Sequence, residues 1–153
     1  MSVFLSHKKE NEKEALIIAR YLEINNIQYY IDVFDPNIQD TDDITSLLLK
    51  RVRGCTHLMA IVSEYTEKSW WVPFEIGVAS EIEKRITSFQ LKSIKMPDFL
   101  SKWPIIKSME DLEIFVKLYR QDSAVNLSER KYATASISNA DQFHKKLKAS
   151  LYQ

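Results

Sequence analysis

Short apolar runs alternate along this chain with longer segments in which apolar and polar residues are mixed. The runs SVFLS at 2–6, IQYYID at 27–32 and HLMAIV at 57–62 predict three buried strands. A fourth strand is expected within ITSFQLKSIKM at 86–96. The segments between these runs show helical spacing, so the pattern predicts strands and helices in turn.

Apolar stripes and end signals mark several of the expected helices. One stripe has the i, i+3, i+4, i+7 spacing of an amphipathic helix and consists of Ala15, Ile18, Ala19 and Leu22. Asp42 or Asp43 can cap a helix through ITSLLLKRVRG, and Ser108 can open one through SMEDLEIFVKLYR. These signals predict a helix in each connection.

The remaining boundaries are set by proline and by polar composition. A helix is expected to begin between Ser69 and Pro73, because proline fits only near a helix start, and to run to about Arg85. The segment 121–138 is polar and is expected to be variable and mobile. A last helix is expected at about 139–152.

Strands that alternate with helices indicate an α/β fold, with a parallel central sheet and helices on both faces. Ligands of such sheets bind at the carboxyl ends of the strands. Those ends are the loops after Ser6, Asp32 and Ser63, and Glu75 lies just beyond the third. The fold alone therefore brings Glu75 towards the edge that Ser6 occupies.

Composition limits the partners and the compartment. The chain has 153 residues, which suits a single domain over 1–153, and 21 basic against 21 acidic residues, which argues against nucleic acid as a partner. Its apolar runs are too short to span a membrane. The single Cys55 forms no internal disulfide and no signal peptide is visible, so a cytoplasmic location is expected.

Two common kinds of chemistry have no support in the sequence. The only glycines, Gly54 and Gly77, belong to no phosphate-binding fingerprint, which excludes a dinucleotide-binding dehydrogenase or a P-loop enzyme. The three histidines, His7, His57 and His144, lack the spacing of a metal site. No metal and no bound cofactor are therefore expected.

The stretch SWWVPFE at 69–75 places a carboxylate in apolar surroundings. Trp71 and Glu75 lie one helical turn apart, and Phe74 is next to the acid. A charge there is costly unless it is paired, so Glu75 is either a structural acid or part of a pocket. Of Trp70 and Trp71, one is expected to pack inward.

Four stretches together resemble the Toll/interleukin-1 receptor (TIR) domain family. They are VFLSH at 3–7, YYIDVFD at 29–35, IVSEYTEKSWWVPFE at 61–75 and KMPDFLSKWPIIKSMEDLEIFVKLY at 95–119. Their order and spacing are similar to those of the family over about residues 2–120. The resemblance implies a flavodoxin-like TIR fold.

Many TIR domains cleave the nicotinamide bond of NAD, and the resemblance places their catalytic glutamate at Glu75. It implies NAD⁺ as substrate, no cofactor, and release of nicotinamide with ADP-ribose or a cyclic isomer. The substrate-binding residues that the resemblance implies are Ser6, His7, Lys8, Phe34 and Trp71.

The resemblance also implies partners. TIR domains associate with one another, and free-standing bacterial members of Thoeris-type antiphage systems pass a nucleotide signal to a separate effector. Two alternatives stay open at this point. One is a non-catalytic TIR scaffold that acts through TIR–TIR contacts, and the other is an enzyme like a nucleoside deoxyribosyltransferase.

Overall fold

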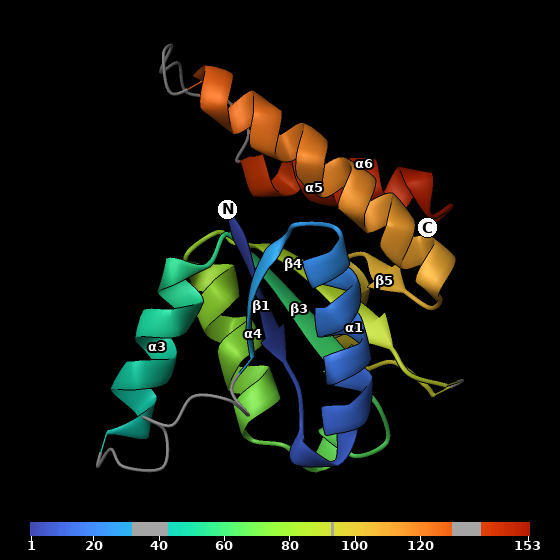
Figure 1. Cartoon of the computed structure of the whole chain (residues 1–153). Helices are drawn as coiled ribbons and strands as arrows, with labels where there is room; N and C mark the ends of the chain where they lie inside the picture. The colour runs from blue at the N-terminus through green and yellow to red at the C-terminus, as the bar shows by residue number, and fades with distance from the viewer. Residues whose placement is uncertain (32–42, 93, 130–138) are drawn as a thin grey trace.

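The computed structural model describes residues 1–31, 43–92, 94–129 and 139–153, with 123–129 described as helical backbone only. Five parallel strands form one sheet in the order β2-β1-β3-β4-β5 (Figure 1). The strands are β1 (Ser2–Ser6), β2 (Gln28–Ile31), β3 (His57–Val62), β4 (Arg85–Gln90) and β5 (Ile105–Ile106). The predicted α/β fold with a parallel sheet is confirmed.

The direction in which successive strands are added to the sheet changes between β1 and β3. The chain runs outward from β1 to β2 and then crosses back to β3 on the other side of β1. In the register of these two strands, Val3 lies opposite His57 and Ser6 opposite Ala60. The connections that leave β1 and β3 therefore go to opposite faces, and sheets of this kind bind ligands at the carboxyl ends of two such strands.

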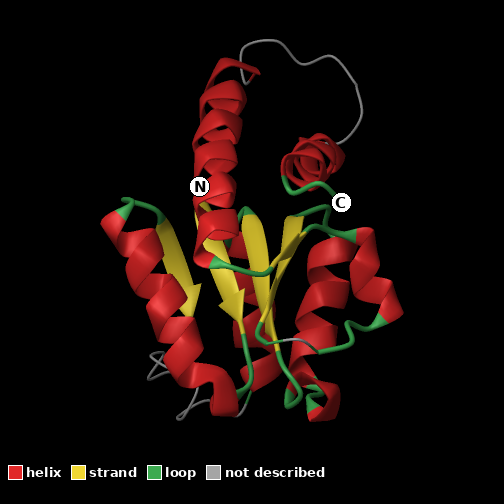
Figure 2. Cartoon of the chain, turned by 90° about the vertical axis from the view of Figure 1, so that its right-hand side faces the viewer, coloured by secondary structure: helices red, strands yellow, loops and turns green. Residues whose placement is uncertain are grey.

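Helices cover both faces of the sheet (Figure 2). One face carries α1 (Glu12–Ile24), α5 (Met109–Glu129) and α6 (Asn139–Ser150), and the other carries α3 (Ile44–Gly54) and α4 (Trp71–Glu81). Short 3₁₀ turns are η1 (Lys9–Asn11), η3 (Thr66–Lys68) and η4 (Asp98–Lys102). No helix within the described ranges combines the length and the apolar character that a bilayer crossing requires.

The central strand β3 is buried along its whole length, as its unbroken apolar sequence predicts. Met59 and Ile61 face the core under α1 and α5, whereas Leu58 and Ala60 face the core under α3 and α4. The stripe predicted for α1 is buried as well: Ala15, Ile18, Ala19 and Leu22. Two apolar layers thus hold the sheet between its helices.

Side-chain caps are present at two predicted helix starts, and a left-handed asparagine follows the end of α1. Asn26 adopts a φ of 57° after α1, a conformation that asparagine tolerates. Asp43 caps α3, because its Oδ1 accepts the backbone N–H of Ser46 at 2.9 Å. Ser108 opens α5 in the same way, with its Oγ accepting the N–H of Asp111 at 3.2 Å.

The end of α4 differs from the expected one. The helix stops at Glu81, and Glu83 takes a φ of 53°. The N–H of Lys84 then donates to the carbonyl of Ala79 at 2.8 Å, a bond that closes a helix with a left-handed residue. Arg85 consequently begins β4 and is not the last residue of the helix.

The helix α5 also differs, because it continues to Glu129 through half of the segment expected to be variable and mobile. Residues 109–129 contain no proline or glycine that would end it. Its extension is anchored to β4, since Arg85 Nε lies 2.5 Å from Asp122 Oδ2 and Arg85 Nη2 donates to Asp122 Oδ1 at 3.2 Å. Polar composition alone therefore gave the wrong end for this helix.

A buried histidine lies beneath α5 and α6, at the start of β3. His57 is 1% exposed and its Nδ1 lies 2.9 Å from the hydroxyl of Thr56. The rings of Phe115, Tyr119 and Phe143 surround the imidazole at centroid distances of 5.9, 4.7 and 4.9 Å. Burial holds the pKa of His57 well below its usual value, so the ring is neutral in the folded chain.

Acid is expected to destabilise this end of the molecule through His144 in α6. Its Nε2 accepts the N–H of Ile86 at 2.8 Å, and burial lowers the pKa of His144 from 6.5 to about 4. The unfolded chain binds this proton first, so stability falls as the pH drops from 6.5 towards 4. The shift corresponds to ~3 kcal/mol, which partial exposure reduces to roughly 1–2 kcal/mol.

Urea unfolding over that pH interval measures the effect. His144→Gln keeps an acceptor for Ile86 but does not titrate, so its free energy of unfolding is expected to vary less with pH than that of the parent. Identical slopes for the two proteins would contradict this role of His144.

Candidate active site

The carboxyl edge of the sheet, at the ends of β1 and β3, contains a buried carboxylate paired with a hydroxyl. Ser6 is the last residue of β1, and Glu75 lies in the first turns of α4, directly beyond β3. Ser6 is 0% and Glu75 2% exposed. The hydroxyl of Ser6 donates a hydrogen bond to Oε2 of Glu75, so the two residues predicted to share this edge are in contact.

Glu75 occupies a position of α4 that belongs to its buried stripe. Val72, Ile76 and Ala79 are the apolar members of the stripe. A carboxylate in such a place costs several kcal/mol unless polar groups compensate it. The Ser6 hydroxyl supplies part of that compensation. The acid predicted to be either structural or part of a pocket is therefore a buried side chain at the carboxyl edge of the sheet.

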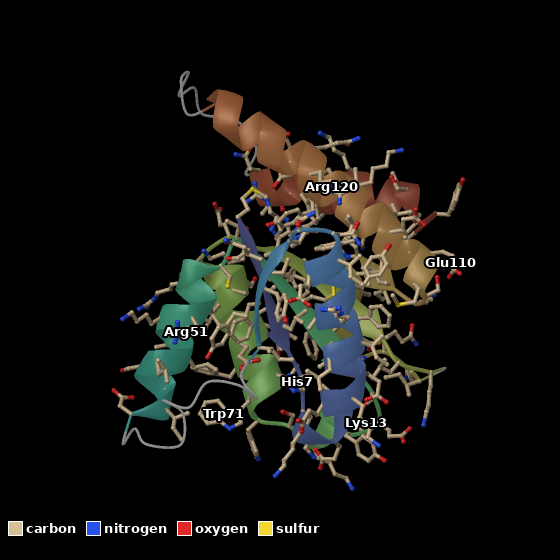
Figure 3. All side chains as sticks on the ribbon, viewed as in Figure 1. His7, Lys13, Arg51, Trp71, Glu110 and Arg120 are labelled. Atoms are coloured by element: carbon tan, nitrogen blue, oxygen red, sulfur yellow. The ribbon has the colours of Figure 1, made fainter. Side chains whose placement is uncertain are left out.

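His7 brings two hydrogen-bonding atoms to the same edge. Within the described part of the chain, its Nδ1 and Nε2 are buried and have no hydrogen-bond partner of normal geometry. Burial lowers the pKa of His7, and the nearby Leu5 backbone and Glu12 carboxylate only partly oppose that shift. Figure 3 shows His7 and Trp71 at the end of the molecule where β1 finishes. A ligand that binds here would meet a neutral imidazole.

Aromatic rings are exposed beside Glu75. Trp71 is 47% and Phe74 38% exposed, and their rings meet edge to face with centroids 6.0 Å apart. Trp70 is 91% exposed. The expectation that one tryptophan packs inward is wrong, because the buried stripe of α4 begins at Val72 and both indoles precede it. They form an aromatic surface next to the buried acid.

The other predicted substrate-binding residues are less well defined by contacts. Lys8 Nζ lies 3.1 Å from Oε1 of Glu10, and the lysine side chain is 25% exposed, so its charge stays close to the β1–α1 connection. Phe34 lies outside the described residues. The structure thus joins Ser6 to Glu75 by a bond, and His7 and Lys8 follow Ser6 in the chain.

Two polar residues next to this edge are absent from the site residues predicted from the sequence. The Oγ of Ser63, directly after β3, donates to Oδ1 of Asn11 at 2.7 Å, and both side chains are buried. There was a reason in the sequence to consider Ser63, since it is the first polar residue after a buried strand. There was no such reason to consider Asn11, because it lies within the polar run KKENEKE.

A groove of about 850 Å³ lies elsewhere, between β2, the end of α1 and α3. It is lined in part by Tyr29, Tyr30, Lys50 and Arg51, and the Arg51 guanidinium lies 4.8 Å from the ring centre of Tyr30. Its residues flank the amino ends of the strands, and Glu75 is not among them. We therefore define the candidate site by the buried carboxylate of Glu75 and not by the volume of this groove.

Comparison with known proteins shows what kind of domain carries this site. The TIR domain family model matches residues 3–114, nearly three quarters of the chain. The chain belongs to the TIR domain family. The matched range contains β1 with Ser6 and α4 with Glu75, and the helix α6 lies beyond it.

Two similar proteins illustrate the range of this family. The probable 3' cyclic ADP-D-ribose synthase ThsB' of Bacillus cereus (strain MSX-D12) is 25% identical over 88 residues, which are 55% of this chain and 46% of that protein. This chain thus matches less than half of the relative's length. The crystal structure of the TIR domain of the Toll-related receptor TRR-2 from Hydra magnipapillata superimposes with a TM-score of 0.63 at 14% identity, covering 78% of this chain and 95% of that one. This chain and the Hydra domain therefore share the TIR fold.

Proposed function

We propose that this TIR domain is an NAD⁺ nucleosidase that breaks the bond between nicotinamide and ribose. The observation that carries the proposal is Glu75, a carboxylate 2% exposed that accepts the Ser6 hydroxyl at the carboxyl edge of the sheet. The relative named as a probable cyclic ADP-D-ribose synthase supports the same chemistry.

The reaction suits a single carboxylate. Both electrons of the bond between ribose C1' and the ring nitrogen leave with nicotinamide, and positive charge develops at C1' and the ribose ring oxygen. An anionic side chain close to the ribose stabilises that charge. Nicotinamide departs as a neutral molecule, so the leaving group needs no general acid. Glu75 can therefore serve without a second carboxyl group.

The neighbouring residues fit supporting roles. The Ser6 hydroxyl orients the Glu75 carboxylate. The buried ring nitrogens of His7 offer a donor and an acceptor to the ribose hydroxyls. The half-exposed Trp71 offers a flat surface against which a nicotinamide or adenine ring can pack. Lys8 supplies a cation on the side where the diphosphate would lie.

The fate of the ribosyl cation determines the product. Water gives ADP-ribose and a proton, whereas attack by an atom of the same molecule gives a cyclic isomer that is lighter by one water. The name of the Bacillus relative favours the cyclic product. Our proposal includes that such a nucleotide acts as a signal for a separate effector, in a bacterial defence against phage.

Incubation of the purified protein with NAD⁺, followed by liquid chromatography and mass spectrometry, tests the function. Nicotinamide released by the parent and not by Glu75→Gln is the expected result, and the mass of the second product distinguishes hydrolysis from cyclisation. Turnover of deoxynucleosides without turnover of NAD⁺ would instead indicate a deoxyribosyltransferase-like enzyme.

A non-catalytic scaffold is the second candidate, and the exposed aromatic surface favours it. Trp70 at 91% and Trp71 at 47% exposure are side chains that often contribute to protein contacts. A scaffold needs no reactive acid, so equal inactivity of the parent and Glu75→Gln at high protein concentration would favour this function.

Self-association is expected to raise activity. TIR domains act through contacts with one another in both proposed functions, and the exposed aromatic residues lie beside Glu75. The rate of nicotinamide release per subunit is therefore expected to increase with protein concentration or with a crowding agent. A rate per subunit that stays constant over a hundredfold range of concentration would contradict this expectation.

A further inference from the structure

A buried hydrogen bond joins the two connections that leave β1 and β3. Asn11 ends η1 in the connection that follows β1, and Ser63 begins the connection that follows β3. Their exposed fractions are 3% and 7%, and Ser63 Oγ donates to Asn11 Oδ1 at 2.7 Å. The residues are 52 positions apart in the chain, so this contact is tertiary and not part of a local turn.

Ser63 is itself fixed by the turn that leads to α4. Its Oγ accepts the N–H of Tyr65 at 3.1 Å, and its own N–H donates to Thr66 Oγ1 at 3.0 Å. The N–H of Thr66 returns to the carbonyl of Ser63 at 3.0 Å. Ser63 therefore cannot shift without moving the turn that positions the start of α4.

Two bridges thus join the same parts of the chain at the carboxyl edge of the sheet. Ser6 to Glu75 joins the end of β1 to α4, and Asn11 to Ser63 joins the β1–α1 connection to the end of β3. We propose that Asn11 and Ser63 are positioning residues that hold Ser6 and Glu75 at their bonding distance. The kinetic part of this inference rests on the proposed NAD⁺ nucleosidase function, whereas its geometric part does not.

The physical reason is the stiffness of a satisfied, buried polar pair. If Ser63 loses its hydroxyl, Asn11 keeps a buried carbonyl oxygen without a donor, and the connection must rearrange or admit water to satisfy it. The rearrangement would move η1 and, with it, the residues that precede it after Ser6. Reactions that depend on a held geometry are sensitive to displacements of about 1 Å.

The other end of the same strand pair offers a matched control. Thr56 precedes β3, and its Oγ1 accepts the N–H of Ser2 at 3.1 Å and donates to the carbonyl of Ser2 at 3.0 Å. Thr56→Val therefore removes a hydroxyl that links β1 and β3, as Ser63→Ala does, but at the edge away from Glu75. Thr56→Val loses both bonds to Ser2 and the contact with His57 Nδ1. Ser63→Ala loses the bond to Asn11 and the bond from the N–H of Tyr65. The control therefore removes at least as many polar contacts as the variant that it is compared with.

The first measurement needs no enzymatic activity. The ¹³C resonance of the Glu75 carboxyl group, assigned by its absence in Glu75→Gln, reports the hydrogen bond from Ser6. We expect this resonance to move in Ser63→Ala and in Asn11→Ala, and to stay in place in Thr56→Val. An unchanged Glu75 resonance in Ser63→Ala and Asn11→Ala, with both proteins folded, would overturn the proposal.

The second measurement compares the kinetics of nicotinamide release. Ser63→Ala is expected to lower kcat about tenfold or more with a smaller change in KM, because positioning of the acid matters most in the transition state. Ser63→Thr, which keeps the hydroxyl, is expected to restore most of the rate. Equal kcat values for Ser63→Ala and Thr56→Val would show a purely structural role and overturn the proposal.

The two readouts separate the two hypotheses. A parent that releases no nicotinamide removes the proposed enzymatic function, and the carboxyl resonance then decides alone whether Asn11 and Ser63 hold Glu75. If the parent releases nicotinamide, Ser63→Ala has a lower kcat and the Glu75 carboxyl resonance moves in that variant, both the enzymatic function and the positioning role are supported.

Discussion

Glu75→Gln is expected to lower the rate of nicotinamide release by at least about a hundredfold, the size of effect seen when one stabilising group of a reaction site is removed. The amide has the shape of the carboxylate and can still accept the Ser6 hydroxyl. What it lacks is the negative charge that stabilises the ribosyl cation. Release of nicotinamide from NAD⁺, measured at substrate concentrations around KM, quantifies the loss.

Glu81→Gln is the control for this substitution. Glu81 lies in the same helix α4, but its side chain is exposed. Its replacement by glutamine is the same chemical change as Glu75→Gln. We expect it to retain the activity of the parent. Circular dichroism and thermal unfolding show whether each variant is folded. Activity in a folded Glu75→Gln that equals the parent's would remove Glu75 from the reaction and leave its bond to Ser6 as a structural one.

The largest effect on stability is expected from Asp122→Ala, which should lower the free energy of unfolding by about 3 kcal/mol, because loss of one partner leaves the other charge buried and unpaired. The side chains of Arg85 and Asp122 are 11% and 14% exposed, and two nitrogen–oxygen contacts join them. His57 Nε2 lies 4.0 Å from Asp122 Oδ2 on the buried side. The substitution therefore affects the docking of α5 on β4 and β3.

Urea unfolding of Asp122→Ala beside Glu113→Gln measures this contribution. Glu113 lies in the same helix with an exposed side chain, so its substitution is expected to change the free energy of unfolding by less than about 0.5 kcal/mol. A similarly small effect for Asp122→Ala would mean that the ion pair contributes nothing and that apolar packing alone holds α5. The Glu75 site, at the opposite edge of the sheet, should be unaffected in either case.

The strands, and the shared edge of Ser6 and Glu75, were predictable because they depend on short-range patterns. HLMAIV has the unbroken apolar character of a strand covered on both faces, and β3 is that strand. Strand and helix alternation then predicts a parallel sheet, which places Ser6 and Glu75 at one edge before any coordinates are known. The bond between them confirms this prediction.

Features that depend on tertiary partners were not predictable in the same way. Nothing in the polar run after Arg120 indicates that α5 continues, because the stabilising partner of Asp122 is Arg85 on β4. Asn11 looks like one polar residue among many until Ser63, 52 positions away, becomes its neighbour. The end of α4 depends on a left-handed Glu83, a residue type that gives no sign of that conformation.

The three tryptophans allow unfolding and ligand binding to be followed by intrinsic fluorescence. Trp103 is 7% exposed within the core under α3 and α4, whereas Trp70 and Trp71 are exposed next to Glu75. Emission from the buried indole of Trp103 reports unfolding, and emission from Trp70 and Trp71 responds to a molecule that covers the surface beside Glu75. A Trp103→Phe protein would therefore read occupancy of the site, and a protein with Trp70 and Trp71 both changed to phenylalanine would read the core, without any attached dye.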